Sequence, residues 1–435
     1  MHKTIGHIIS IFLTQWGVLF LSVVTSILMA RNLGPEGRGI LALVLLVPAF
    51  LQKIGSLGIG DSAIYYLGKS PHLFSPIAFQ IIFLVTLSSG LMVVLFALLF
   101  PLLSKNLIKG IPSSYLVVAL ISLPFNLLIV HFGDLFLAIG EISLRNFLNI
   151  LNSFLRLLFL FVALIIIKGY VLEAVAALTI VAIFTAIFSF YHIVRYELPN
   201  PKIETNLIQK LVSYGIKGEM ANIIMFFNYR LDMFLVNLWC GRSEVGYYIV
   251  AVLLAEMLWQ IPHAVTTVLF PKFSSKDKKE AGELTATSCR YTTLLLFLLC
   301  VILALLAHPL IRIFYGRAFA LSVSPLLILL PGIFFAGSTA PITAYLKSIG
   351  RPDCLLIKSL IMLPFAVLLN IIIIPHWGIK GAAFTSSVYY SIGAMVAIYF
   401  YLRFSRRPFW KTFCPEMNDF RTIKDFLFEW WLNVT

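Results

Sequence analysis

LVSYGIKGEMANIIMFFNYRLDMFLVNLWC, residues 211–240, is apolar enough to cross a membrane but carries Lys217, Glu219, Arg230 and Asp232. On an α-helix, part of this stretch forms one polar and aromatic face, because the residues follow i, i+3, i+7, i+11, i+14 and i+18 spacing. That face consists of Glu219, Asn222, Phe226, Arg230, Met233 and Asn237.

An ionised side chain that faces lipid costs several kcal/mol, so this face should lie against other helices or a water-filled cavity. One interpretation is a buried ion pair that locks two helices together. The other is a cavity wall that handles a charged substrate. In that case Lys217 and Arg230 would bind the substrate, and Glu219 and Asp232 would serve ion coupling or gating.

The composition is that of an integral membrane protein. Of the 435 residues, 60% are hydrophobic and 12% are charged, and the mean hydropathy is +0.96. The net charge of +14 is explained by Lys and Arg in cytoplasmic loops, with a surplus for an anionic ligand, so no nucleic-acid partner is expected. The five cysteines are scattered without a CxxC pair, which argues against a disulfide or metal framework.

Apolar runs of about 20 residues predict an all-α protein with about twelve membrane-spanning helices. Such runs are too long for the strands of a membrane β-barrel. The predicted spans are residues 8–30, 39–66, 75–102, 114–139, 146–167, 171–194, 210–239, 246–270, 290–314, 321–346, 354–374 and 379–402.

The distribution of Lys and Arg predicts the orientation. With the N-terminus inside, the inner loops collect roughly 20 basic residues and the outer loops about 9, so both termini should be cytoplasmic. The expected location is the cell (inner, cytoplasmic) membrane. Residues 405–435 carry an apolar helical face with Trp430 and Trp431, which predicts a helix lying on the inner membrane surface.

The chain also repeats itself at an offset of about 210 residues. An even number of spans separates equivalent points, so the halves should be parallel six-helix repeats. We therefore expect a first lobe at 1–196, a cytoplasmic linker at 197–209, a second lobe at 210–404 and a tail at 405–435. The matching segments are 33–39 with 240–246, 138–140 with 348–350, and Gly169 with Gly378.

Further ionisable residues fall at membrane depth in the first half: Lys53, Asp61, His131, Asp134 and Arg156. Lys53 and Asp61 would share a face on an unbroken helix, but the glycines between them favour a kink. Asp61 and Asp134 fit either a gate or a structural salt bridge. Lys53 and Arg156, with the two cations of residues 211–240, would suit a phosphate or diphosphate if they converge on one cavity.

In the second half, Glu256, Gln260, His263 and Thr267 would share one helical face. Glu256 and His263 could take up and release a proton, or His263 could be a hydrogen-bonded core residue. The sequence has no phosphate-binding glycine loop, zinc spacing or nucleotide-binding domain. We therefore expect no enzyme activity and no cofactor, and uphill transport would need an ion gradient, of H⁺ or Na⁺, or the membrane potential.

Several motifs together resemble the polysaccharide-export flippases, the Wzx-type O-antigen and capsule flippases of the MOP exporter superfamily. They lie along nearly the whole chain. The superfamily also holds the MATE drug antiporters and the lipid II flippases. The segments are ARNLGPEGRGILA at 30–42, Tyr248, Pro262 and PKFS at 271–274, SIGRP at 348–352, NIIIIP at 370–375, Gly378, and GAA at 381–383.

This resemblance implies a V of two six-helix bundles and alternating access by rocking of the lobes. It implies a polyprenyl-diphosphate-linked oligosaccharide moved from the inner to the outer leaflet, with its charged part in a cationic cavity and its tail in the membrane lipid. Lipid II flippases typically have two additional helices and arginines in the first helix, whereas here no Lys or Arg lies between Lys3 and Arg31. One common type of MATE antiporter carries an Asp in that helix, which this chain lacks.

Other functions remain open from the sequence. A cation or drug antiporter would want an acidic, aromatic cavity, whereas the basic residues here favour an anionic cargo. A membrane glycosyltransferase or polymerase would usually need a large extramembrane loop, and no outer loop is long enough. A scaffold gives no reason for charged faces inside the membrane. Nothing in the sequence requires more than a monomer.

Overall fold

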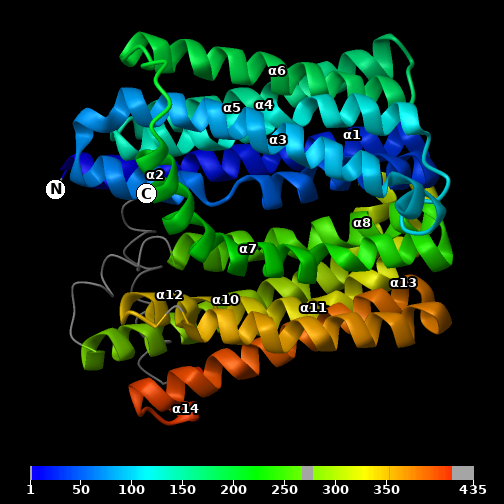
Figure 1. Ribbon diagram of the computed structural model, residues 1–435. Coiled ribbons are helices and arrows are strands. Elements are labelled where there is room, and N and C mark those ends of the chain that lie inside the picture. Colours follow the sequence, from blue (N-terminus) through cyan, green and yellow to red (C-terminus); the bar gives the residue numbers. More distant parts are fainter. Residues whose placement is uncertain (1, 267–277, 352, 414–435) are drawn as a thin grey trace, which may run out of the picture. The chain divides into compact units, whose positions relative to one another are not determined.

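The computed structural model describes residues 2–266, 278–351 and 353–413, and within these ranges the secondary structure is helical, without strands (Figure 1). The first part of the chain forms α1 His2–Gly55, α2 Ile59–Lys69, α3 Phe74–Lys105, α4 Ser113–Ala138, α5 Ile142–Phe161, α6 Val171–Tyr196, α7 Thr205–Cys240 and α8 Arg242–Glu256. The rest forms α10 Lys278–Leu310, α11 Val323–Ser338, α12 Ala340–Ser348, α13 Asp353–Ser405 and α14 Phe409–Phe413.

Short 3-10 and π segments adjoin these helices: η1 Pro71–Leu73, η2 Val162–Ile166, η3 Met257–Trp259, η4 Ile311–Tyr315 and η5 Arg317–Ser322. Residues 260–266 are helical as well. Most of the predicted amphipathic tail, including Trp430 and Trp431, lies outside the described residues.

Kinks at two glycines reconcile the number of long helices in the structure with the number of predicted spans. In the described part of the chain, ten helices are long and apolar enough to cross a membrane. Two of them are kinked pairs, because α1 bends at Gly34 (φ 64°) and α13 at Gly378 (φ 57°). Both angles lie in the left-handed region, which glycine adopts without a steric penalty. Each pair supplies two spans, so the prediction of an all-helical protein with about twelve membrane helices is confirmed.

The first compact unit consists of residues 1–250 with 311–321 and 370–381. Its helices pack as neighbours, with α4 against α6, α1 against α5, and α7 against α1 and α2. Large apolar side chains fill the interior, among them Phe74, Phe132 and Phe136, each at most 1% exposed. Inside a membrane such packing, rather than exclusion of water, holds helices together.

The described part of the second unit belongs to 251–310, 322–369 and 382–435. Here α10 packs against α11, α12 and α14. The buried Tyr401 hydroxyl donates to the Gly282 carbonyl at 2.8 Å, and the Tyr401 ring meets the Tyr345 ring at 5.4 Å. Arg290 donates to the Lys411 carbonyl at 2.6 Å, which fixes α14 on α10.

The compact units differ from the lobes expected from the repeat in one respect. Helix α7, which the repeat assigns to the second half, packs with the helices of the first half. The lobe boundaries at 197–209 and 405 therefore stay predictions. The fold shows that α7 packs against α1 and α2.

Candidate functional site

The charged face of α7 meets α1 at a loose ion pair. The Lys53 Nζ lies 4.0 Å from Glu219 Oε1, and the Asn222 amide donates to Glu219 Oε2 at 3.0 Å. Glu219 is 5% exposed, whereas the Lys53 side chain is 44% exposed. Glu219 Oε1 has no hydrogen-bond partner among the described residues. The carboxylate is thus buried and incompletely satisfied, and its predicted role in ion coupling or gating stays a prediction.

Aromatic side chains fill the space beyond this pair. The Phe50 ring lies 4.1 Å from that of Phe227, 5.8 Å from Phe226 and 6.5 Å from Phe234, centroid to centroid. The sequence placed Phe226 on the polar face but gave no sign of the cluster around Phe50. The cluster makes this part of the α1–α7 contact apolar.

Farther along α7, Asp232 is held by Tyr248 of α8. The Tyr248 hydroxyl donates to Asp232 Oδ2 at 2.6 Å, and the Met233 amide donates to Oδ1 at 2.8 Å. Asp232 is 3% exposed and Tyr248 is fully buried. A buried carboxylate is tolerated only where such donors replace water. Sequence analysis missed Tyr248 as its partner, because spacing along one helix cannot show which other helix faces it.

We expect Tyr248→Phe to lower the free energy of unfolding by about 1–3 kcal/mol, because it leaves a buried carboxylate oxygen without this donor. Thermal unfolding of the purified protein in detergent measures the effect. Tyr345→Phe is the matched control, since the buried Tyr345 hydroxyl has no hydrogen-bond partner among the described residues. Equal unfolding temperatures for the two variants would contradict the role of Tyr248.

Just beyond the α1–α7 contact, two glycines let the backbones of α1 and α8 touch. A Cβ on Gly39 would lie 1.8 Å from the Arg242 carbonyl oxygen, and one on Gly246 would lie 1.8 Å from that of Pro35. Neither position can hold a side chain without movement of the backbone. The two glycines occupy equivalent positions in the predicted repeat 33–39 and 240–246, so the repeated motifs contact each other.

An ion pair and hydrogen bonds stabilise this contact between α1 and α8. Arg242 Nη2 pairs with Glu36 at 2.8 Å, and Arg242 Nη1 donates to the Gly110 carbonyl at 2.8 Å. The Asn237 amide donates to the Leu107 carbonyl at 3.0 Å. The loop between α3 and α4 is therefore tied to the start of α8. Arg242 entered the sequence analysis only through the repeat motif, without a functional assignment.

The backbone at the start of α2 approaches α7 just as closely. A Cβ on Gly58 would lie 2.2 Å from the Gly215 carbonyl oxygen, and one on Gly215 would lie 2.5 Å from that of Gly58. The Ser62 hydroxyl donates to the Leu211 carbonyl at 2.6 Å, and the rings of Tyr65 and Tyr214 stack at 4.5 Å. We call the contact of α1 with α8 the 39/246 contact, and that of the start of α2 with α7 the 58/215 contact.

The expected break before Asp61 is present, since α1 ends at Gly55 and α2 begins at Ile59. Lys53 and Asp61 therefore do not share a continuous helical face. Asp61 is exposed in the first turn of α2. The predicted face therefore does not form in the structure, and Asp61 lies at the 58/215 contact instead.

Asp134 belongs to a charged group on α4 and α5. Its carboxylate lies 3.7 Å from Arg145 and 3.9 Å from the fully buried His131 Nδ1. A Cβ on Gly60 would lie 1.9 Å from Asp134 Oδ2, so α2 approaches this carboxylate closely. Asp134 was predicted to form either a gate or a structural salt bridge, and the structure shows the salt bridge. A gating role stays a prediction.

Arg156 and Arg230 have different surroundings in the structure. Arg156 lies on α5, about 21 Å along the helix from Ile142, and its side chain is exposed. It has no hydrogen bond or ion pair among the described residues. Arg230 is half-buried and donates to the Tyr229 carbonyl at 3.3 Å. Lys217 lies on α7, but its side chain is outside the described structure.

The helical face predicted from Glu256 to His263 was wrong in its geometry. Helix α8 ends at Glu256, and the 3-10 turn η3 follows before residues 260–266 resume a helix. The 3.6-residue spacing from Glu256 to His263 therefore does not hold, because a 3-10 turn rotates the chain differently. Thr267 lies outside the described residues. The proposed proton roles of Glu256 and His263 stay predictions.

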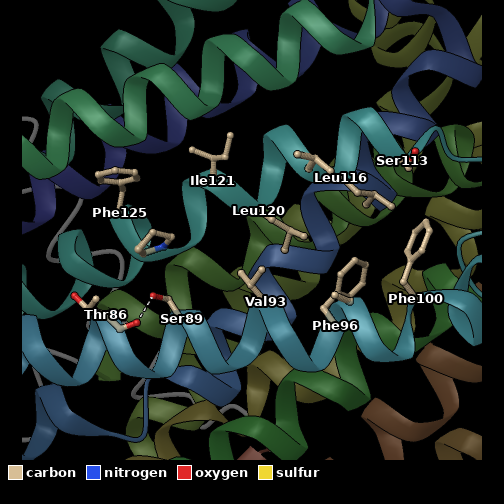
Figure 2. A pocket seen from close by; sticks show the side chains of 14 residues that line it. Thr86, Ser89, Val93, Phe96, Phe100, Ser113, Leu116, Leu120, Ile121 and Phe125 are labelled. Atoms are coloured by element: carbon tan, nitrogen blue, oxygen red, sulfur yellow. Dashed lines mark hydrogen bonds between the residues drawn. The ribbon is translucent and has the colours of Figure 1, made fainter.

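An apolar groove of about 720 Å³ lies between α3 and α4 (Figure 2). Figure 2 shows Phe96, Phe100 and Leu116 around it. Two of its hydroxyls donate to carbonyls within α3: Thr86 to that of Ile82 at 2.8 Å and Ser89 to that of Thr86 at 3.2 Å. The lining is mostly apolar and without a cationic side chain, which suits hydrocarbon, so the charged residues of α1, α5 and α7 remain the candidate site.

Solved structures of similar fold are transporters. A lipid II flippase MurJ in an inward closed conformation matches with a TM-score of 0.75 and 16% identity, over 91% of this chain and 90% of that chain. An inward-facing multidrug resistance MATE family transporter of the MOP superfamily matches with a TM-score of 0.73 and 14% identity, over 90% and 95%. At these identities the likeness shows the fold, which confirms the MATE-like architecture predicted from the motifs.

Two curated relatives are similar in sequence. The succinoglycan biosynthesis transport protein ExoT of Rhizobium meliloti (strain 1021) is 27% identical over 352 residues, 78% of this chain and 68% of ExoT. The putative O-antigen transporter of Shigella flexneri is 27% identical over 240 residues, 53% of this chain and 56% of that protein. A family model described as "Polysaccharide biosynthesis protein" matches residues 28–324. Because this match spans more than half of the chain, the protein belongs to the polysaccharide biosynthesis protein family.

Proposed function

We propose that the protein is a flippase for polyprenyl-diphosphate-linked oligosaccharides, which it moves from the inner to the outer leaflet during surface polysaccharide synthesis. The family and the names of the relatives, which include a succinoglycan transport protein and an O-antigen transporter, support a polysaccharide cargo. The MurJ-like fold supports lipid-linked transport by alternating access. The same names support a transporter rather than an enzyme.

The single observation that carries an anionic cargo is the guanidinium of Arg156. It lies at mid-membrane depth on α5, exposed and without an acidic partner among the described residues. An ionised group at this depth needs a counter-charge or water. The diphosphate of a lipid carrier supplies a counter-charge that the arginine fork binds in two places.

We assign the remaining candidate residues the roles predicted from the sequence. Lys53, Lys217 and Arg230 join Arg156 in binding the anionic part of the cargo. Coupling to H⁺ or Na⁺ and gating fall to the carboxylates and the histidine. These are Glu219, Asp232, Glu256, His263, Asp61 and Asp134.

A MATE-like cation or drug antiporter is the second candidate, and the fold, with a TM-score of 0.73 to such a transporter, is compatible with it. Its site would use buried carboxylates such as Glu219 and Asp232. Both candidates are multi-pass membrane proteins. Our proposal places this protein in the cell membrane as a monomer with both termini in the cytoplasm.

The test is lipid analysis of a strain from which the gene is deleted. We expect polyprenyl-diphosphate glycans to accumulate on the inner leaflet and to disappear when the wild-type gene is restored. Unchanged lipids together with altered sensitivity to cationic drugs would replace the flippase by the antiporter.

A further inference from the structure

A pocket of about 590 Å³ lies beside the Gly34 kink of α1, where α1 meets η4 and η5. Arg31, Arg312 and Arg317 line it, and all three are exposed. Gly34 and Gly316 line it too, and no atom lies within 4 Å of a Cβ position on either. The main chain at both glycines therefore borders open space.

The described residues around this pocket leave its positive charge uncompensated. None of those that line it is Asp or Glu. In the adjoining segments 26–40 and 311–322 the sequence has a single acid, Glu36. That carboxylate pairs with Arg242 at 2.8 Å, so it does not neutralise the pocket arginines. Arginines that line the same pocket favour an anion between them.

Arg31 is held in place by the opposite wall. Its Nε donates to the Phe314 carbonyl at 2.7 Å and its Nη2 to that of Ile313. Both acceptors are neutral carbonyls, so the charge of the guanidinium is kept. Within the described structure the other Nη makes no hydrogen bond, which leaves donors available for a ligand.

A buried arginine adds to the charge. Arg38 is 5% exposed, and its Nε has no hydrogen-bond partner within the described ranges. Tyr315, one of the residues that line the pocket, lies near Arg38. Burying a guanidinium with an unmade hydrogen bond is costly. An anion in the neighbouring pocket would offset part of that cost.

The place of the pocket is unusual for so many arginines. Residues 13–33 of α1 cover about 30 Å, the thickness of the hydrocarbon core, so the pocket lies on the membrane side opposite the N-terminus. In the orientation expected from the charge distribution, that is the outer side, where Lys and Arg are normally scarce. A cluster against this trend indicates a ligand rather than a topology signal.

We propose that this arginine pocket binds a phosphate-type anion, and that in transport it receives the diphosphate of the lipid carrier on the outer side of the membrane. The second half of the proposal rests on the flippase function; the anion site rests on the arginines alone. Guanidinium groups from two walls match the several oxygens of a diphosphate better than a single carboxylate or chloride.

Hydrogen exchange of the full chain in nanodiscs of phosphatidylcholine tests the site. Inorganic pyrophosphate at about ten times its Kd should slow exchange of amides in residues 26–40 and 311–322 by about tenfold. The double variant Arg312→Gln/Arg317→Gln should lose this protection. The control Arg403→Gln/Arg406→Gln, with the same charge change on exposed arginines of the C-terminal part of the chain, should keep it.

Protection that persists in the double variant, or none with any phosphate compound, would overturn the proposal. Protection by phosphatidylglycerol nanodiscs but not by pyrophosphate would assign the pocket to a bilayer headgroup and overturn the diphosphate assignment. The flippase function is tested separately by lipid analysis of the deletion strain. Pyrophosphate protection without accumulated lipid there would remove the flippase and leave the anion site.

Discussion

Gly39→Ala should abolish most export while the protein is still made and inserted. The added methyl would lie 1.8 Å from the Arg242 carbonyl oxygen, so α1 and α8 must separate at the 39/246 contact. Overpacking of this kind typically costs about 1–3 kcal/mol. If this cost falls on one conformation of the transporter, the population of that conformation decreases by about 5–150-fold. Glycan export per unit of membrane protein measures the loss.

Two further variants make this test specific. Gly246→Ala meets the Pro35 carbonyl oxygen at the same 1.8 Å and should give the same loss. The pair changed together should lose little more, because one separation of the backbones relieves both. Gly68→Ala is the control, since no atom lies within 4 Å of its Cβ position. Normal export by Gly39→Ala would show that this contact need not close.

Arg156→Ala should reduce export about 10- to 100-fold, because hydrogen bonds to a charged partner contribute about 1.5–3 kcal/mol. The unfolding temperature should stay near that of the wild type, since Arg156 has no protein partner in the described structure to leave unsatisfied. Arg156→Lys keeps the charge but loses the planar fork, so intermediate export is expected. The readouts are surface glycan per cell and thermal unfolding in detergent.

The control for Arg156 is Arg403→Ala, which removes an exposed arginine near the end of α13. It should leave export unchanged. If Arg156→Ala exports normally, Arg156 is not part of the cargo site. If it exports poorly and also unfolds early, its role is structural.

Much of the fold could be predicted because apolar runs and glycines affect the backbone at their own place in the sequence. A run of apolar residues long enough for the membrane predicts a span wherever it occurs. The expected break between Lys53 and Asp61 appeared at Gly55–Gly58, since closely spaced glycines leave the helix little to hold it straight. The repeat likewise pointed to residues 33–39 and 240–246, which proved to touch.

The pairing of residues could not be predicted in the same way. The periodicity of α7 placed Glu219 and Asn222 on one face, and they are hydrogen bonded, but it could not name Lys53 as the neighbour on another helix. Tyr248 was noted only as part of a motif, and its bond to Asp232 depends on how α8 packs. The helical face predicted from Glu256 to His263 is interrupted by a 3-10 turn after Glu256. Nothing in an apolar run signals such a turn.

The packing of α7 has a consequence for how the polypeptide can be divided. The chain passes between its two compact units after residues 250, 310, 321, 369 and 381, but not at the linker 197–209. A cut in that linker therefore falls within one unit, and the fragments would still meet through the 39/246 and 58/215 contacts. Co-expressed as separate polypeptides, residues 1–200 and 201–435 should reassemble in trans, whereas a break near residue 250 leaves α8 itself in two pieces.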